Sequence, residues 1–136
     1  LRGATVAAYT VSPDYAIVLE ATTAGDIASV ADDKKVCTLG NGPVVSFMDK
    51  RTIYDKELYN LAFDTAIANE IPCQTKTMIA GGNDAGAIHT SRGGVRTLAI
   101  SVPCRYLHSA SCVIDIQDFN NTARLAKLML DRIYNK

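Results

Sequence analysis

Apolar and polar residues follow one another along the chain in a pattern that predicts alternating strands and helices. Residues 15–19 form a continuous apolar run, which is typical of a strand that is buried on both faces of a sheet. The mainly apolar segments 43–48 and 96–102 are also predicted to be strands. Segment 73–79 alternates between apolar and polar side chains, which indicates a fourth strand.

Two segments carry apolar residues at the spacing of an amphipathic helix. The first spans residues 56–70, with Asp55 as the predicted N-cap and Pro72 just beyond the end. The second begins at Asp115 or Gln117. Its predicted core-facing stripe consists of Phe119, Ala123, Ala126, Leu130 and Ile133. Residues 2–10 are rich in small side chains and fit either a helix or a strand.

Strands that alternate with helices predict an α/β fold. We expect a three-layer α/β/α sandwich, in which helices cover both faces of a mostly parallel or mixed sheet. No repeat, low-complexity tract or linker interrupts the pattern, so residues 1–136 are expected to form one domain or a large piece of one.

Composition narrows the partners that the chain is expected to bind. Fourteen basic residues balance fourteen acidic ones, and nucleic acids and anionic membranes both require a basic excess. No apolar run approaches the roughly 20 residues that span a bilayer. We therefore expect neither a nucleic-acid nor a membrane partner. The four cysteines form no CxxC pair, which is typical of reduced thiols in a cytoplasmic protein.

Candidate chemistry lies after the predicted strands, because open α/β sheets bind ligands at the carboxyl ends of their strands. Glu20 follows the run at 15–19, a glycine-rich loop at 81–86 follows segment 73–79, and His108 follows the run at 96–102. A carboxylate there fits a cation ligand or a salt-bridging glutamate, and the imidazole fits a metal ligand or a structural histidine. The loop fits a ligand cradle or a tight turn. The residues by themselves leave these alternatives open.

Three ordered motifs stand out when the whole chain is considered. They are Gly-Gly-Asn-Asp-Ala-Gly-Ala-Ile-His at 81–89, Gly-Val-Arg-Thr-Leu-Ala-Ile-Ser-Val-Pro at 94–103 and Arg-Tyr-Leu-His-Ser at 105–109. Together they resemble metallopeptidase family forty-two, whose members are glutamyl, deblocking or TET aminopeptidases, some of them also called cellulases or endoglucanases. Further segments match the family at 1–4, 13–20, 40–49, 71–74 and 113–115.

The resemblance implies a zinc-peptidase-like fold, of which residues 1–136 form the C-terminal portion of the catalytic domain. It implies an aminopeptidase that hydrolyses N-terminal residues from peptides at a site with two divalent metal ions, either zinc, cobalt or manganese. It also implies that Glu20 and His108 are metal ligands, although many members have Asp in place of Glu20. The substrate-site residues that it implies are Gly82, Asn83, Asp84, Arg105 and Tyr106, and most members have Thr where this chain has Asn83.

The family's general-base glutamate precedes the segment that matches residues 1–4, and the other metal ligands lie further upstream. A polypeptide that begins at Leu1 is therefore expected to hold no catalytic base and at most two metal ligands, whereas a catalytic zinc typically has three. We expect this chain alone to be inactive. The resemblance also implies homo-oligomers, either dimers or dodecamers, for the full-length enzyme.

Two alternatives to an aminopeptidase remain. The first is a non-catalytic partner-binding or assembly module with the same fold. The second is a glycoside hydrolase, which would need two carboxylates facing each other across a cleft. The absence of tryptophan disfavours this second alternative, since no aromatic platform for a sugar is evident.

Overall fold

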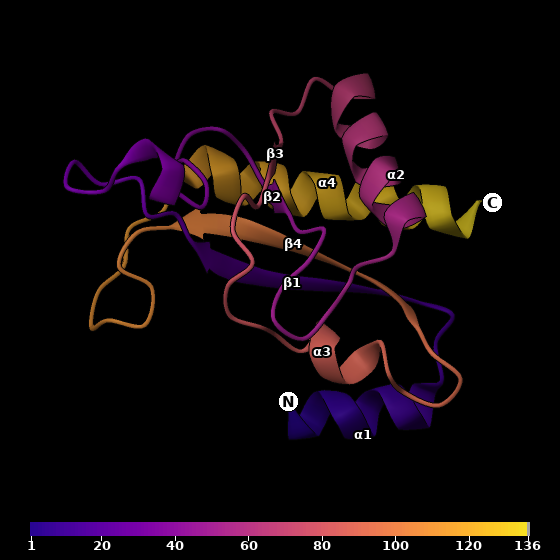
Figure 1. The fold of residues 1–136 in the computed structure, drawn as a ribbon. Helices are drawn as coiled ribbons and strands as arrows, with labels where there is room; N and C mark the ends of the chain where they lie inside the picture. The colour runs from indigo at the N-terminus through magenta and orange to yellow at the C-terminus, as the bar shows by residue number, and fades with distance from the viewer. Residues whose placement is uncertain (136) are drawn as a thin grey trace.

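A mixed four-stranded sheet runs through the middle of the computed structural model, which describes residues 1–135 (Figure 1). In sheet order, its strands are β1 (Tyr15–Thr23), β4 (Arg96–Cys104), β2 (Val44–Val45) and β3 (Gln74–Thr75). β1 pairs with β4 in parallel and β2 with β3 in parallel, whereas β2 and β4 are antiparallel. The predicted mixed sheet is therefore confirmed.

Helices cover both faces of this sheet. α2 (Lys56–Ala68) and α4 (Ile116–Tyr134) lie on one face, and α1 (Arg2–Val11) and α3 (Ala85–Ile88) lie on the other (Figure 1). A single 3₁₀ turn, η1 (Asp32–Lys34), interrupts the loop between β1 and β2. The structure thus has the three layers that the sequence predicts, and the segment that fitted either a helix or a strand forms the helix α1.

The main core lies between the sheet and the helices α2 and α4. Leu98 and Ile100 on β4 and Leu125 and Met129 on α4 are fully buried in it. β4 is buried along almost its whole length, because β1 and β2 flank it in the sheet and helices cover it on both faces. This rigid strand leads directly into the loop that carries His108.

Two predicted strand ends were wrong, and both strands are longer than expected. β1 continues past Leu19 to Thr23, so Glu20 lies inside the strand, opposite Ser101 of β4. β4 continues through Pro103 to Cys104. The Cys104 carbonyl accepts from the N–H of Ala24, in the segment after β1, so the backbone of Pro103 faces the side of β2. The ladder between β2 and β4 reaches only as far as Ser101, so no strand pairs with Pro103 on that side. Proline removes no ladder hydrogen bond at such a position.

The two other predicted strands are shorter than expected. Only Val44–Val45 of segment 43–48 and Gln74–Thr75 of segment 73–79 belong to the sheet. After β2 the chain turns away, and Met48 bridges back to Ile53 in a local hairpin. Residues 43–46 are buried, whereas segment 73–79 is mostly half-buried or exposed, so an apolar or alternating pattern alone does not establish a ladder partner.

Both predicted helix starts are confirmed at their caps. The Asp55 carboxylate accepts from the Leu58 N–H at 2.9 Å, and the Asp115 carboxylate accepts from the Gln117 N–H at 2.7 Å. Each bond satisfies one of the backbone donors that a helix leaves free in its first turn.

The predicted core stripe of α4 is confirmed at Ala126, which is buried, and at Ile133, which packs against the core, but it was wrong at Phe119, Ala123 and Leu130. Phe119 and Leu130 are 50% and 56% exposed, whereas the buried face consists of Asp118, Thr122, Leu125, Ala126 and Met129. Asp118 sets this rotation, because its two carboxylate oxygens accept the N–H groups of Gly40 and Gly42 at 2.7 Å each. A buried aspartate is costly unless its oxygens are paired, so the helix turns its Asp118 face inward toward that loop.

The described residues contain no helix that is both long and apolar enough to cross a lipid bilayer. All four cysteines are free thiols, of which Cys37 and Cys104 are buried.

Replacing Asp118 with alanine tests its role as the acceptor that fixes α4. We expect the substitution to lower the free energy of unfolding by about 2–3 kcal/mol, because the buried Gly42 N–H and the partly buried Gly40 N–H lose their charged acceptor. Urea unfolding would measure the change. Asp131→Ala, at an exposed position of the same helix, is the matched control and should change stability by less than about 0.5 kcal/mol. Equal effects of the two substitutions would contradict this role.

Candidate active-site cleft

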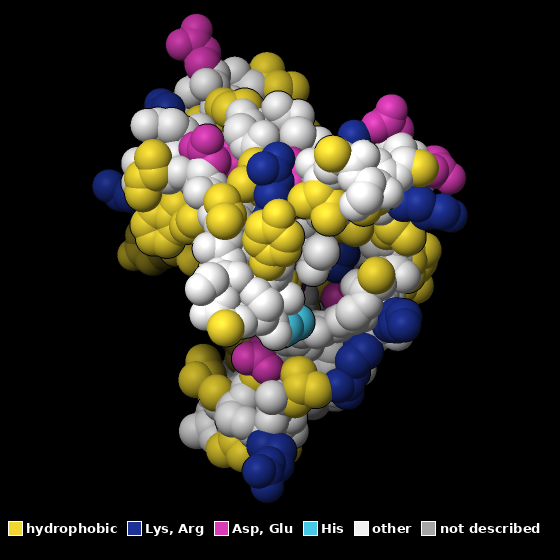
Figure 2. Space-filling view, turned by 90° about the vertical axis from the view of Figure 1, so that its left-hand side faces the viewer, with side chains coloured by type: hydrophobic (Ala, Val, Ile, Leu, Met, Phe, Trp, Pro, Cys, Tyr) yellow, Lys and Arg dark blue, Asp and Glu magenta, His cyan; other side chains and the backbone are white. Residues whose placement is uncertain are grey.

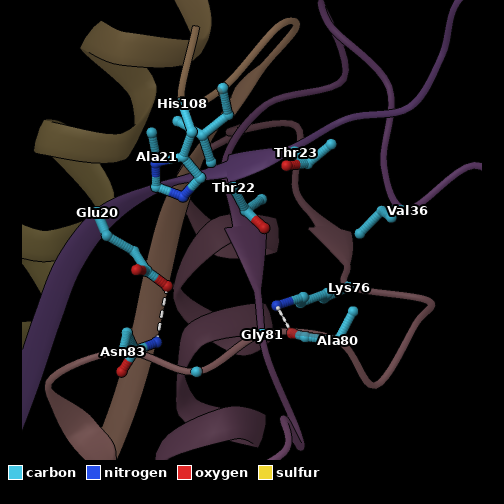
Figure 3. A pocket seen from close by; sticks show the side chains of 12 residues that line it. Glu20, Ala21, Thr22, Thr23, Val36, Lys76, Ala80, Gly81, Asn83 and His108 are labelled. Carbon is cyan, nitrogen blue, oxygen red and sulfur yellow. Dashed lines mark hydrogen bonds between the residues drawn. The ribbon is translucent and has the colours of Figure 1, made fainter.

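A cleft of about 240 Å³ opens at the carboxyl end of β1, between the loop after β4 and the segment that joins β3 to α3. Figure 2 shows this side of the molecule, where a histidine, an acidic and a basic side chain lie around a hollow. Glu20 and His108 both line the cleft (Figure 3). The two candidate ligands, far apart in the sequence, are thus brought to one cavity.

Glu20 is partly buried on β1, and its carboxylate is held from one side. Its Oε1 accepts from the Asn83 side-chain amide at 2.7 Å, and the Ser101 hydroxyl lies at 3.5 Å. Burial raises the pKa of Glu20, while the Asn83 hydrogen bond and the charge of Lys76 act in the opposite direction. Oε2 accepts no hydrogen bond from residues 1–135, so the carboxylate keeps free lone pairs toward the cleft.

A chain of hydrogen bonds fixes the orientation of Asn83, the residue that donates to Glu20. The Asn83 amide donates to Tyr54 Oη at 2.9 Å as well as to Glu20, and its oxygen accepts from the Ala85 N–H at 2.8 Å. Tyr54 in turn donates to Asp49, which also accepts backbone N–H groups after it. Burial, and then the Asp49 hydrogen bond, raise the pKa of Tyr54, so its hydroxyl stays protonated. Asn83 therefore has its amide orientation determined on three sides.

His108 lies in the loop after β4, in which two residues adopt the left-handed backbone conformation. Tyr106 has φ 60° and His108 has φ 67°, a conformation that non-glycine residues adopt only where surrounding contacts hold it. Backbone hydrogen bonds between Arg105 and Val113 close the loop, and Ser109 Oγ donates to the Tyr106 carbonyl at 2.7 Å. The His108 side chain is exposed and forms no hydrogen bond within residues 1–135. Its imidazole is therefore available to a ligand.

The other five predicted site residues divide into two groups. Gly82 and Asn83 line the cleft, whereas Asp84, Arg105 and Tyr106 do not. Asp84 lies at the start of α3 with its side chain half exposed, and the Tyr106 side chain is exposed outside the cleft. The substrate roles of all five stay predictions, and the geometry favours the first two.

Arg105 holds the His108 loop in place rather than facing the cleft. Its guanidinium donates to both oxygens of Asp26, at 2.7 and 2.9 Å, and Asp26 also accepts from the Leu39 N–H at 3.0 Å. The Arg105 hydrogen bond lowers the pKa of Asp26 to about 2. This bidentate pair joins the loop after β4 to the loop after β1.

Sequence reasoning missed Lys76 and Tyr54. Lys76 lines the cleft although it lies in a segment whose alternation places charged residues on a solvent face. Its Nζ donates to the Ala80 carbonyl at 2.9 Å. Tyr54 gives no motif signal either, because its role depends on contacts with Asp49 and Asn83 that come from distant segments.

Within residues 1–135, no group of three or more His, Cys, Asp or Glu side chains is arranged to hold a metal ion. Glu20 and His108 nevertheless have the donor types that zinc, cobalt and manganese accept. The carboxylate of Glu20 and the imidazole of His108 could each supply one ligand to a metal ion. The remaining ligands would have to come from other residues.

Comparison with known proteins identifies relatives of one kind. The family model of the M42 glutamyl aminopeptidases matches residues 1–125. The lysyl aminopeptidase of Pyrococcus furiosus is 35% identical over 136 residues, which cover 98% of this chain and 37% of that protein. The glutamyl aminopeptidase of Lactococcus lactis subsp. cremoris is 36% identical over 120 residues, 88% of this chain and 32% of that protein.

Solved structures give the same result. A TET aminopeptidase from a marine sediment archaeon of the Thaumarchaeota aligns with a TM-score of 0.89 and 34% identity, over 95% of this chain and 36% of that one. The TET1 peptidase of Pyrococcus horikoshii, which can assemble into a tetrahedron or a large octahedral shell, aligns with a TM-score of 0.77 and 28% identity, over 94% and 36%. The chain thus spans about a third of the length of the proteins it matches.

The Asp26–Arg105 pair gives a test in which the pH dependence has a defined sign. Asp26 has a pKa of about 2 in the folded state against an ordinary 3.8, so its contribution is present above about pH 4 and is lost as the pH falls toward 2. We expect Asp26→Asn to cost about 1–2 kcal/mol at pH 7, a range reduced for screening because Arg105 is 36% exposed. The difference from the unsubstituted protein should shrink below pH 4.

Urea unfolding at pH 7, 4 and 2.5 would measure this difference. Asp33→Asn is the control, because Asp33 is 74% exposed in its pair with Lys34. A difference between the Asp26→Asn and unsubstituted proteins that does not change with pH would contradict the assignment.

Proposed function

The chain belongs to the M42 glutamyl aminopeptidase family, and on that premise we propose that it supplies part of the active site of a metal-dependent aminopeptidase. The observation that carries the proposal is the meeting of Glu20 and His108 in one cleft at the carboxyl edge of the sheet. A carboxylate on a strand and an imidazole on the loop after the neighbouring strand are donors for divalent cations. We propose that residues 1–136 are the C-terminal portion of the catalytic domain.

In this proposal Glu20 and His108 each bind one of two divalent ions, and zinc, cobalt and manganese are the candidates. The chemistry that such ions supply is polarisation of the scissile carbonyl and activation of a water molecule. The residues of this chain hold the ligands in place. Asn83 orients the Glu20 carboxylate through its 2.7 Å bond, and Arg105 holds the loop of His108 through Asp26.

The arrangement also indicates what this stretch lacks. Residues 1–135 offer two candidate ligands and no third, while catalytic zinc sites typically have three. Among residues 1–135, Glu20 is the only carboxylate that lines the cleft, and it would be engaged as a ligand, so the general base would come from elsewhere in this proposal. We therefore propose that this polypeptide by itself is inactive and that the activity belongs to the longer protein.

Two further parts of the proposal concern the setting of the enzyme. The TET1 relative, which assembles into tetrahedral and octahedral shells, supports a homo-oligomer, either a dimer or a dodecamer. The four free cysteines support a reducing compartment, and we propose the cytoplasm. The substrate would be a peptide with a free N-terminus.

Removing either candidate ligand in the longer protein that contains these residues tests the function. We expect His108→Ala and Glu20→Gln each to lower kcat/KM toward aminoacyl-nitroanilides at least about 100-fold, because outer-shell substitutions at metal sites already cost 10- to 100-fold. We also expect each to reduce the metal content measured by inductively coupled plasma mass spectrometry.

The matched control is His89→Gln. The His89 imidazole bonds to the Ala85 carbonyl at 2.8 Å and lies outside the cleft, so activity and metal content should stay within about twofold of the original. A fully active and fully metallated His108→Ala protein would contradict the proposal. Absence of metal and of peptidase activity from the unsubstituted protein would favour the alternative, a non-catalytic module with this fold.

A further inference from the structure

Lys76 is a buried lysine that faces the candidate active site. Its side chain lines the cleft, yet the residue is only 8% exposed. Lysine is among the residues most rarely buried, because its ammonium loses hydration. The backbone delivers it there directly, since the Lys76 N–H donates to the Val45 carbonyl at 3.0 Å and extends the pairing of β2 with β3 by one residue. The position of the charge is thus built into the sheet.

The ammonium group is only partly satisfied by the protein. It has three N–H donors and gives one of them to the Ala80 carbonyl at 2.9 Å. Among residues 1–135, no carboxylate forms an ion pair with it. In Figure 3 Lys76 reaches into the cleft from one side and Glu20 from the other. Its charge lowers the pKa of Glu20, but the two groups do not meet.

The rest of the cleft is small and neutral near the ammonium. Thr22, Ala80 and Gly81 line it there, and none of them carries a charge. The whole cleft, which includes the end at Glu20 and His108, has a volume of about 240 Å³. An anionic group of the substrate would therefore find one cation and no competing anion on this side.

We propose that Lys76 determines specificity by binding the side-chain carboxylate of an acidic N-terminal residue, aspartate or glutamate, of the peptide substrate. This inference rests on the proposed aminopeptidase function. Family membership leaves the question open, because the relatives include both a glutamyl and a lysyl aminopeptidase. A buried ammonium favours an acidic side chain and also disfavours lysine and arginine by repulsion.

The competing role for Lys76 is electrostatic support of Glu20. In that role the residue would keep the Glu20 carboxylate ionised and would never touch substrate. The two roles differ in one measurable respect. Loss of a contact with the substrate side chain affects acidic substrates only, whereas a weakened Glu20 affects every substrate to the same extent.

The experiment compares glutamyl-, glutaminyl-, leucyl- and lysyl-nitroanilides with the longer, metal-loaded protein that contains these residues. Glutamyl and glutaminyl groups have nearly the same shape and differ in charge, and these substrates have no C-terminal carboxylate. We expect kcat/KM for glutamyl to exceed that for glutaminyl about 10- to 100-fold, the effect of one charged hydrogen bond in a cleft. This comparison needs no substitution, so it holds even where a variant fails to fold.

The Lys76→Gln variant should lose that 10- to 100-fold advantage, so that its kcat/KM falls at least about 10-fold more for the glutamyl substrate than for the leucyl and glutaminyl substrates. Lys76→Arg should retain a glutamyl preference, and Lys76→Glu should shift the preference toward lysyl. Lys50→Gln, at an exposed position outside the cleft, is the matched control and should change nothing. Thermal melting confirms that each variant is folded.

Each other result overturns the inference. Equal losses of kcat/KM for all four substrates in Lys76→Gln would mean that Lys76 supports the charge of Glu20 and does not bind the substrate side chain. A wild-type preference for lysyl, or equal rates for glutamyl and glutaminyl, would exclude an acidic side chain beside Lys76 while leaving the aminopeptidase function intact. Failure to hydrolyse any of the four substrates would remove the proposed function and this inference together.

Discussion

The parallel pairing of β1 with β4 is the constraint on which the candidate site depends. Parallel strands end at the same edge of a sheet, so side chains near both ends meet there although the chain between them is long. The register places Glu20 opposite Ser101, and the loop that carries His108 begins at Arg105, just after the last pair of the ladder. A slip of one residue would turn Glu20 to the opposite face of the sheet. The buried side chains of β4 hold that register and so hold the site.

Buried charge is handled in two different ways in this fold. Asp118, Asp49 and Asp26 each accept hydrogen bonds on both of their oxygens, from backbone N–H groups, from a tyrosine or from an arginine. Their charges are compensated, and they fix a helix or a loop. Glu20 and Lys76 are compensated only in part, and both face the cleft. Incompletely paired buried charges are expected at sites that bind something else.

Local signals made the fold class, the helix α2 and the general location of the site predictable from the sequence. Asp55 and Pro72 delimit α2, and the rule that ligands bind at the carboxyl ends of strands singles out Glu20, the loop at 81–86 and His108, all of which contribute to one cleft. Contacts between distant segments decided the rest. The rotation of α4 depends on the hydrogen bonds that the Gly40 and Gly42 N–H groups donate to Asp118. The spacing of apolar residues along a helix gives no sign that an aspartate is buried. The burial of Lys76 depends on the loop of Ala80 and Gly81, which closes over it.

The separation of Lys76 from Glu20 decides whether both can serve one site. In ion-pair contact with Glu20, the ammonium would compete with a cation for the carboxylate, because two positive charges close together repel each other strongly in a poorly solvated cleft. The Ala80 carbonyl holds the ammonium away from that contact, and the Asn83 amide holds the carboxylate on the other side. Neither of these two holding bonds involves a charged partner, so each charge stays available. In the proposed arrangement, the end of the cleft that would bind a cation is thus separate from the end that would bind an anionic side chain of the substrate.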